Sequence, residues 1–193
     1  GSYVFPAVAP LIIHQTIVLG LGMLLGGYKE ERYQPTSSQF WGIFASFFTI
    51  GCLGCLYMFG FVFWKNDYPH GGNFWGMLVA VPIFVSCIVS LGLLFGSLLD
   101  MSERAGHFLV FTSIPLFLLT GTAWPIQAMP HWMQIFSALL PSTHAVQLFV
   151  QLNQMGVHLS AVMPKLMILM LMTVIFLALA YYRWVHRRHN RHS

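Results

Sequence analysis

Residues 166–182 read LMILMLMTVIFLALAYY, an apolar stretch that contains no charged side chain. An α-helix needs about 20 predominantly apolar residues to cross the hydrocarbon core of a bilayer. Because a charge at the bilayer centre costs about 2.5 kcal/mol or more, charged residues are confined to the ends of such helices. Lys165 and Arg183 flank the stretch directly. We therefore predict a membrane-spanning helix whose ends these two residues mark.

The same pattern is repeated along the rest of the chain. Its 9 basic and 5 acidic residues fall in five small clusters, separated by charge-free stretches. Of the 193 residues, 57% are hydrophobic and 7% are charged, whereas about 25% are charged in soluble domains. This composition predicts a single all-α domain over residues 1–193, a polytopic helical membrane protein with five spans. The expected spans are residues 3–27, 40–64, 74–99, 107–123 and 166–182, followed by a basic tail at 183–193.

The distribution of lysine and arginine predicts how these spans are oriented, because cytoplasmic loops carry an excess of basic residues. If the tail is cytoplasmic, seven of the nine basic residues lie inside and only Lys65 and Lys165 lie outside. We therefore expect a cytoplasmic C-terminus and residue 1 on the outer side. The arginines of the tail then suit the membrane surface, and nucleic acid is not an expected partner.

Residues 124–160 carry no charge but are too broken by proline to form one span. A first short helix is expected between Pro130 and Pro141, where an apolar stripe is formed by Trp132, Ile135, Phe136 and Leu139. A second is expected to begin at Ser142 as its N-cap. Its apolar face is formed by Val146, Phe149 and Val150, and its polar face by Gln147, Gln151 and Gln154. Because each helix is only about 20 Å long, we predict an amphipathic re-entrant hairpin that dips into the outer leaflet.

Two stretches resemble a known family. The string GTAWPIQAMPHWMQIFSALLPSTHAVQLF at 121–149 is similar to the late segment of type-2 ABC transporter permeases, and VAPLIIHQTIVLGLGMLLGGYKEE at 8–31 is similar to their second span and its cytoplasmic exit. The resemblance covers essentially the whole chain. It implies a first span, and in one branch an extracytoplasmic domain, that precede the region seen here.

The resemblance also implies a function. Permeases of this family export a substrate, here an amphipathic, drug-like or lipid-like molecule, from the cytoplasm or inner leaflet of a bacterial inner membrane. They pair with a second permease copy or homologue, and cytoplasmic ATPase subunits that bind ATP and Mg drive them. A periplasmic adaptor and membrane lipid are further expected partners. No cofactor or metal site is expected in this chain.

The resemblance places the ATPase-docking loop at residues 28–39, so Lys29, Glu30, Glu31 and Arg32 are the candidate coupling residues. The family often has a longer run there, in which Glu-Arg-Glu is followed by Gly-Thr, and this chain lacks the Gly-Thr pair. A simply solvated loop is the alternative for this run. For the other inner loop, which holds Asp100, Glu103 and Arg104, we expect a solvated loop.

The residues themselves indicate that the energy for transport is not supplied by this chain. None of the three lysines lies in the G-x-x-x-x-G-K-[ST] context that cradles nucleotide phosphates. No acidic residue falls inside a predicted span, where a secondary transporter would carry one. We therefore expect a transporter subunit that is not itself an enzyme.

Two further groups of residues are candidate sites. His14, Gln15 and Thr16 interrupt the first predicted span and are candidates for a substrate pathway, with interhelical hydrogen bonding as the alternative. Trp124, Pro125, Gln147 and Gln151 are candidates for an outer gate. The alternative for the gate is a hairpin that only anchors the bundle in the outer leaflet.

Other functions stay open at this point. A membrane-embedded haem or metal enzyme subunit would use His14, His107 and His144, and a non-transporting anchor would use none of these groups. Cys52 and Cys55 have C-x-x-C spacing, but inside a span two small side chains favour helix packing over redox chemistry. The histidines of the tail are expected to be solvated.

Overall fold

The computed structural model describes residues 4–33, 36–65 and 73–189, and this part of the chain is entirely helical. The helices are α1 (Val4–Glu30), α2 (Ser37–Cys55), α3 (Phe63–Lys65), α4 (Phe74–Leu98), α5 (Glu103–Leu119), α6 (His131–Ala138), α7 (Pro141–Phe149) and α8 (Leu159–His189). Two π-helical segments, Leu56–Val62 and Val150–Gln154, follow α2 and α7, and a 3₁₀ turn, Ile126–Ala128, precedes α6.

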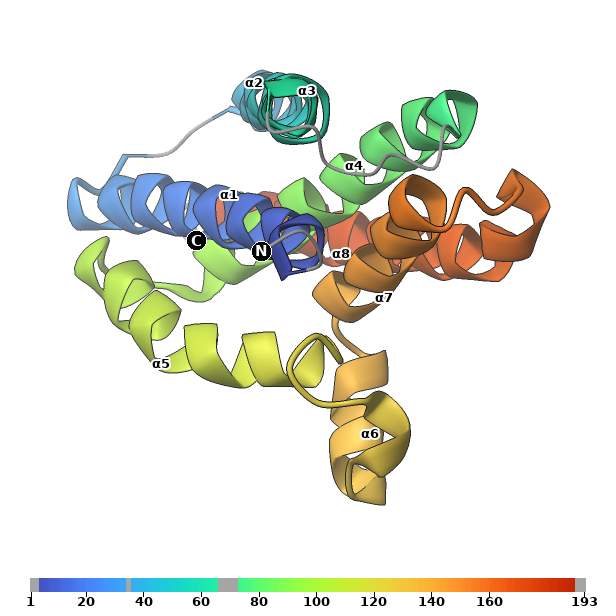
Figure 1. The fold of residues 1–193 in the computed structure, drawn as a ribbon. Coiled ribbons are helices and arrows are strands. Elements are labelled where there is room, and N and C mark those ends of the chain that lie inside the picture. Colours follow the sequence, from blue (N-terminus) through green and yellow to red (C-terminus); the bar gives the residue numbers. More distant parts are fainter. Residues whose placement is uncertain (1–3, 34–35, 66–72, 190–193) are drawn as a thin grey trace.

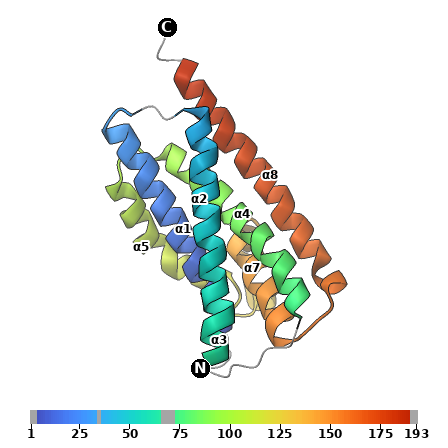
Figure 2. The same cartoon turned by 90° about the horizontal axis from the view of Figure 1, so that it is seen from above.

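The five long helices lie along one another in an elongated bundle, as Figure 2 shows. We call one end of it the basic end: α1, α4 and α8 finish there, and α2 and α5 begin there. Four segments are long and apolar enough to cross a membrane, namely Ala7–Glu30, Ser37–Lys65, Phe74–Leu98 and Leu159–His186. The prediction of an all-α polytopic membrane protein is therefore confirmed.

The fourth predicted span, 107–123, corresponds to α5 but is displaced along the chain. The helix starts at Glu103 and has 17 residues, which is at the short limit of about 17–25 residues for a span. It runs antiparallel to α1, since Ser102 contacts Glu30 at one level and Ser113 contacts Gln15 further along. The last helix is also longer than the predicted 166–182, because neither Pro164 nor Lys165 ends it.

The core of the bundle is built around α4, which packs against both α1 and α8. Its buried side chains include Phe84, Val85 and Ile88, none of which is exposed. Small residues bring α1 close: a Cβ on Gly92 would lie 2.6 Å from Leu21 Cδ1, and one on Gly96 would lie 2.8 Å from the carbonyl oxygen of Leu21. The small residues of α4 therefore serve close helix packing.

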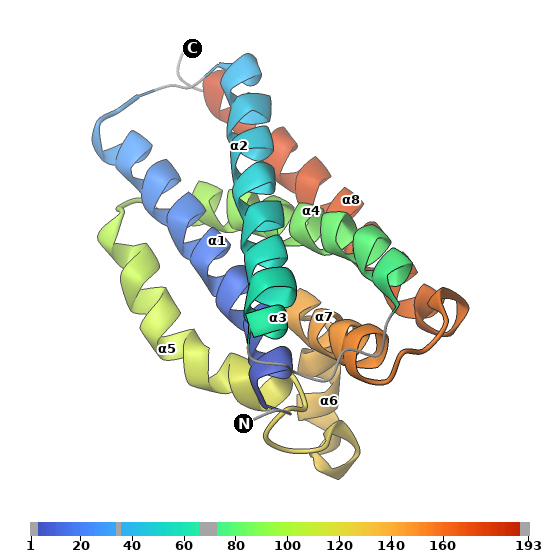
Figure 3. The ribbon, with the colours of Figure 1, turned by 45° about the horizontal axis from the view of Figure 1, so that its top comes forward.

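The predicted pair of short helices is present, but its two members differ. α6 and α7 meet at an angle of 82°, and α6 projects from the bundle (Figures 1 and 3). The stripe predicted on α6 is uncovered by protein, since Trp132, Ile135, Phe136 and Leu139 are all exposed. α7 instead packs against α1, α4 and α8 and most of its residues are buried, so it is an internal helix of the bundle and not the amphipathic surface helix that was predicted.

Ser142 was expected to cap the second short helix, and the structure shows otherwise. The N-cap is Leu140, which has no capping side chain, and Pro141 occupies the first turn. Proline is favoured there because its missing N–H has no intrahelical partner at that position. Ser142 is fully buried inside the bundle, and among the described residues its hydroxyl has no hydrogen-bond partner.

Candidate functional site: the polar network at the basic end

The end of α1 is fixed by a hydrogen-bonded turn. Arg32 adopts a left-handed conformation with φ of 54°. The N–H of Tyr33 donates to the carbonyl of Tyr28 at 2.8 Å, and the N–H of Arg32 donates to the carbonyl of Lys29 at 3.1 Å. This pattern is a Schellman motif, and its usual apolar contact is provided by the rings of Tyr28 and Tyr33, 5.0 Å apart. The motif turns the chain sharply away from α1.

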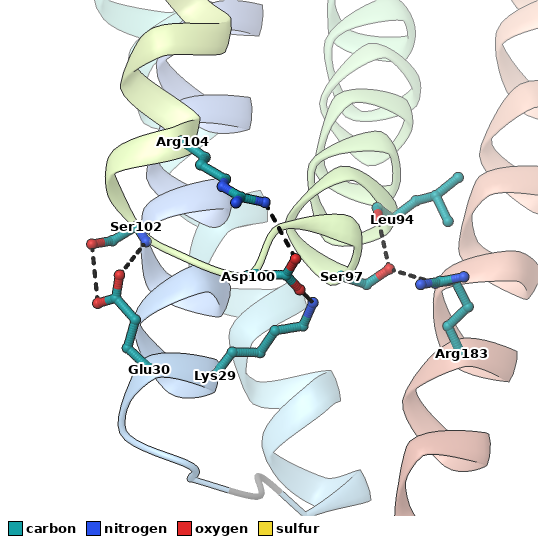
Figure 4. Close-up of polar contacts among 8 residues, drawn as sticks. All are labelled: Lys29, Glu30, Leu94, Ser97, Asp100, Ser102, Arg104 and Arg183. Atoms are coloured by element: carbon teal, nitrogen blue, oxygen red, sulfur yellow. Dashed lines mark hydrogen bonds and ion pairs between the residues drawn. The ribbon is translucent and has the colours of Figure 1, made fainter.

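Asp100 is the centre of an ion-pair network just beyond α4 (Figure 4). Its Oδ1 atom lies 2.8 Å from Lys29 Nζ, and its Oδ2 atom lies 3.3 Å from Arg104 Nη1. One carboxylate therefore joins the last turn of α1 to the first turn of α5. The side chain of Asp100 is 64% exposed and that of Lys29 is 24% exposed, so water screens these pairs and each contributes only about 0–1 kcal/mol to stability.

Glu30 makes a second connection between the same two elements. Its Oε1 atom accepts from the N–H of Ser102 at 3.0 Å, and its Oε2 atom accepts from the hydroxyl of Ser102 at 3.4 Å. Ser102 directly precedes α5 and makes no side-chain cap of its own. The carboxylate of Glu30 therefore caps α5 from another helix, where a negative charge also suits the helix dipole.

The network extends to α8 through Ser97. Arg183 Nε donates to the hydroxyl of Ser97 at 3.1 Å, and that hydroxyl donates to the carbonyl of Leu94 at 2.6 Å. Ser97 is buried on α4. The first arginine after the last predicted span is therefore directed into the bundle rather than simply solvated (Figure 4).

The start of α2 is tied down separately. Thr36 and Gln39 form a capping box, and Gln39 Nε2 donates to the hydroxyl of Tyr33 at 2.6 Å. The ring of Phe40, which is fully buried, lies 5.0 Å from that of Trp184 and 5.4 Å from that of Tyr181 on α8. The connection between α1 and α2 thus leaves one anchored helix end and enters another.

The structure separates the four predicted coupling residues into two pairs. Lys29 and Glu30 are engaged with the connection between α4 and α5. Glu31 and Arg32 follow them and are exposed. Asp100 and Arg104, which we expected in a merely solvated loop, take part in the network. The only sequence signal for this was that opposite charges occur at two helix ends predicted to share one side.

The polar trio of α1 does not form one surface. The imidazole of His14 is buried, and neither nitrogen has a partner among the described residues. Gln15 Oε1 accepts from the hydroxyl of Ser113 on α5 at 2.9 Å. Thr16 is exposed and donates to the carbonyl of Ile12 in its own helix at 2.8 Å. Because consecutive helical residues are about 100° apart, the three side chains point in different directions.

The four residues of the predicted gate are also spread out. Trp124 and Pro125 lie in the turn after α5 and are exposed. Gln147 is half-buried on α7. Gln151 Oε1 accepts from Lys165 Nζ on α8 at 2.8 Å, so this glutamine joins the re-entrant segment to the last helix.

Hydroxyl groups that the sequence analysis missed attach the re-entrant helices to the bundle. The hydroxyls of Ser137 and Thr143 both donate to the carbonyl of Leu119, at 2.7 and 3.3 Å. This carbonyl belongs to the last residue of α5, where no intrahelical partner remains. Both hydroxyl groups are buried. Serine and threonine in apolar surroundings were a signal for such a contact, but not for which carbonyl they reach.

The metal-enzyme alternative is not supported by the described residues, which contain no group of three or more potential metal ligands. His107 is exposed on α5, whereas His14 is buried on α1. His144 Nε2 lies 2.7 Å from the carbonyl oxygen of Ala138. Cys52 and Cys55 are free thiols, consistent with the packing interpretation.

Long apolar helices, charges gathered at the helix ends and a broken re-entrant pair define this chain as a polytopic helical membrane protein. The ABC-2 family transporter protein model matches residues 5–182. The chain therefore belongs to the ABC-2 transporter family.

Individual relatives are distant and longer. The chain is 24% identical to the inner membrane transport permease YhhJ of Escherichia coli over 116 residues, which cover 60% of this chain and 31% of that protein. It is 29% identical to ABC transporter G family member 20 of Dictyostelium discoideum over 94 residues, which cover 47% of this chain and 13% of that protein. The chain thus spans less than a third of the length of either relative. No solved structure matches it.

Proposed function

We propose that this chain is the membrane subunit of an ATP-driven exporter, which moves an amphipathic, drug-like or lipid-like substrate outward. Membership of the ABC-2 family supports transport, and the sequence has no phosphate-binding loop of its own. The energy is then supplied by an ATP-binding partner, and a second permease copy or homologue completes the pathway. A bacterial inner membrane is the proposed location, in line with the name of the Escherichia coli relative.

The basic end is the proposed cytoplasmic face. Seven of the nine basic residues belong to the segments at this end or to the tail that follows α8, as expected for loops that stay inside. The C-terminus is then cytoplasmic, and α6 lies on the outer side. Its exposed apolar stripe suits the outer leaflet, and Trp124, Pro125, Gln147 and Gln151 stay candidates for an outer gate.

The observation that carries the coupling proposal is the division of residues at the exit of α1. Lys29 and Glu30 are held by Asp100 and Ser102. Glu31 and Arg32 are exposed beside them, as Glu30 is, but their side chains form no hydrogen bond or ion pair with a described residue. Because the helix end is anchored, a partner that contacts the exposed pair can displace it without unfolding α1. We therefore assign the ATPase contact to Glu31 and Arg32, with Lys29 and Glu30 as their support.

The substrate pathway remains a proposal at His14, Gln15 and Thr16. Both ring nitrogens of His14, and also Nε2 of Gln15, are buried without a hydrogen-bond partner in the described part of the chain. Buried polar atoms without partners are costly, so a substrate or a water that bonds this imidazole would be favoured. Replacement of His14 by phenylalanine is expected to change which substrates are transported rather than to abolish ATP hydrolysis.

The test is charge reversal at the exposed pair. The permease is purified together with its ATP-binding subunit, and the stimulated ATPase rate is measured for Glu31→Lys and for the control Glu103→Lys, which alters an exposed acid at the same end of the bundle. We expect Glu31→Lys to lower the stimulation by about tenfold, equivalent to a loss of about 1.4 kcal/mol, with unchanged thermal unfolding. Equal rates in both variants would contradict the assignment, and a parent protein that gives no stimulation would favour a non-transporting anchor.

A further inference from the structure

One face of the last turn of α1 contacts three consecutive residues of the connection between α4 and α5, namely Asp100, Met101 and Ser102. A Cβ on Gly26 would lie 2.7 Å from the backbone carbonyl of Met101. Lys29 pairs with the neighbouring Asp100 at 2.8 Å, and Glu30 accepts from the backbone of Ser102 at 3.0 Å. Positions i, i+3 and i+4 lie on the same side of a helix. The contact is therefore a continuous seam of backbone packing, an ion pair and a helix cap.

The seam continues along α5. A Cβ on Gly22 would lie 2.9 Å from the Cβ of Ala105, so small residues keep the two helices close in the next turn. Further along, the hydroxyl of Ser113 donates to Gln15 at 2.9 Å. α1 and α5 are thus joined by polar contacts at two levels, with close packing between them.

Stability alone does not explain the charged part of this seam. The carboxylate of Asp100 is 64% exposed, and exposed pairs contribute little to folding. Both oxygens of Asp100 are nevertheless used, one by Lys29 and one by Arg104. This arrangement fixes the orientation of the carboxylate between α1 and α5. The ion pairs therefore serve to position the two helices more than to stabilise the fold.

We propose that Lys29, Glu30, Asp100 and Ser102 form a clamp that makes α5 follow α1 when the exposed pair Glu31 and Arg32 is displaced. Asp100 and Ser102 are then positioning residues of the coupling device, although Asp100 lies 71 residues from Lys29 and Ser102 lies 72 residues from Glu30 in sequence. This inference rests on the proposed function, because it assumes that a partner acts on that segment. It adds the route by which the movement enters the bundle.

Spin labels can follow the two helices. Gly27 on α1 and Gly106 on α5 are suitable positions, because a Cβ at either would meet no atom within 4 Å. Gly42 on α2 is equally open and provides the control pair with Gly106. The three native cysteines are replaced by alanine, and the full chain with its ATP-binding subunit is placed in lipid nanodiscs. Dipolar broadening is then compared without nucleotide and after trapping with ATP and vanadate.

We expect the pair at 27 and 106 to keep one narrow separation in both states, while the pair at 42 and 106 changes. Asp100→Asn should widen the distribution between 27 and 106 and lower the stimulated ATPase rate by up to about fivefold, equivalent to about 1 kcal/mol for an exposed pair. The control Glu103→Gln, an exposed acid in the same turn, should do neither. Lys29→Gln combined with Asp100→Asn should be no worse than Asp100→Asn alone, because both remove the same contact.

A separation between 27 and 106 that changes on trapping in the parent protein would overturn the clamp, and so would an Asp100→Asn distribution as narrow as the parent's. These results differ from a failure of the proposed function, in which the parent protein gives no ATPase stimulation at all. The comparison of parent and Asp100→Asn without nucleotide needs no ATP-binding partner. It therefore tests the clamp even if that function is wrong.

Discussion

Different interactions stabilise the two ends of the bundle. At the basic end, exposed ion pairs and a carboxylate cap join α1 to α5. At the opposite end, neutral side chains bond to backbone carbonyls, as Ser137 does at Leu119 and Asn73 does at Val157. Lys165 at this end donates to the amide of Gln151 and has no acidic partner among the described residues. Loss of a buried neutral hydrogen bond costs about 1–3 kcal/mol, against about 0–1 kcal/mol for an exposed ion pair. The basic end can therefore rearrange at lower cost than the opposite end, which is what the proposed drive from the basic end requires.

The largest effect is expected where the basic end uses backbone packing instead of charge. Gly26→Ala places a Cβ 2.7 Å from the Met101 carbonyl, whereas a Cβ at Gly27 meets nothing within 4 Å. We expect Gly26→Ala to lower the free energy of unfolding by about 1–3 kcal/mol, because close-packed backbone cannot yield easily. Gly27→Ala should leave it unchanged or raise it by about 0.5–1 kcal/mol, through lower entropy of the unfolded chain. Thermal unfolding in detergent measures both, and equal melting temperatures would contradict the close seam.

A somewhat smaller effect is expected at the neutral end. Asn73 Oδ1 accepts from the N–H of Gly76 at 2.9 Å and caps α4, while its Nδ2 donates to the Val157 carbonyl at 2.6 Å. Asn73→Ala loses both bonds and should cost about 1–2 kcal/mol. Asn73→Asp keeps the cap but puts a second acceptor against the Val157 carbonyl oxygen, so it should also be destabilising. Hydrogen exchange around Val157 should accelerate in both variants, and an unchanged rate would show that this bond does not hold the segment before α8.

The smallest effect sharpens the contrast between the two ends. Lys29→Gln removes the ion pair with Asp100 and should lower the free energy of unfolding by less than about 1 kcal/mol. Raising the salt concentration should shrink the difference from the parent, because the screening length falls from about 10 Å at 0.1 M salt to about 3 Å at 1 M. The cost of Asn73→Ala should not depend on salt. Melting curves at low and high salt measure both costs. If the cost of Asn73→Ala also depended on salt, the proposed difference between the two ends of the bundle would be contradicted.

The spans were predictable because the pattern of charge and apolar length is local. The stretch 166–182 predicts its helix without reference to any other part of the chain. The partners at the helix ends were not predictable in this way, since Lys29 and Asp100 lie 71 residues apart. Their pairing depends on how α1 and α5 pack, which is set by small residues such as Gly22 and Gly26.

In the re-entrant segment, the local sequence pattern predicted the exposure of one helix but not of the other. The apolar stripe of α6 predicted an exposed amphipathic helix, and that helix is exposed. The glutamines of the next helix favoured a surface position by the same logic, yet α7 is buried. Gln151 is accommodated because Lys165 donates to it, a contact between α8 and a segment that periodicity treats separately. Local amphipathicity cannot distinguish a face turned to water from one satisfied by a neighbouring helix.

The proposed function depends most directly on which side of the membrane the basic end occupies. Glu31 at that end and Met155 at the opposite end are both exposed, and each can be replaced singly by cysteine in a chain without native cysteines. In sealed right-side-out vesicles, an impermeant maleimide should label Met155→Cys and should leave Glu31→Cys unlabelled until the membrane is opened. Labelling of Glu31→Cys from the outside would contradict a cytoplasmic basic end and the ATPase contact placed there.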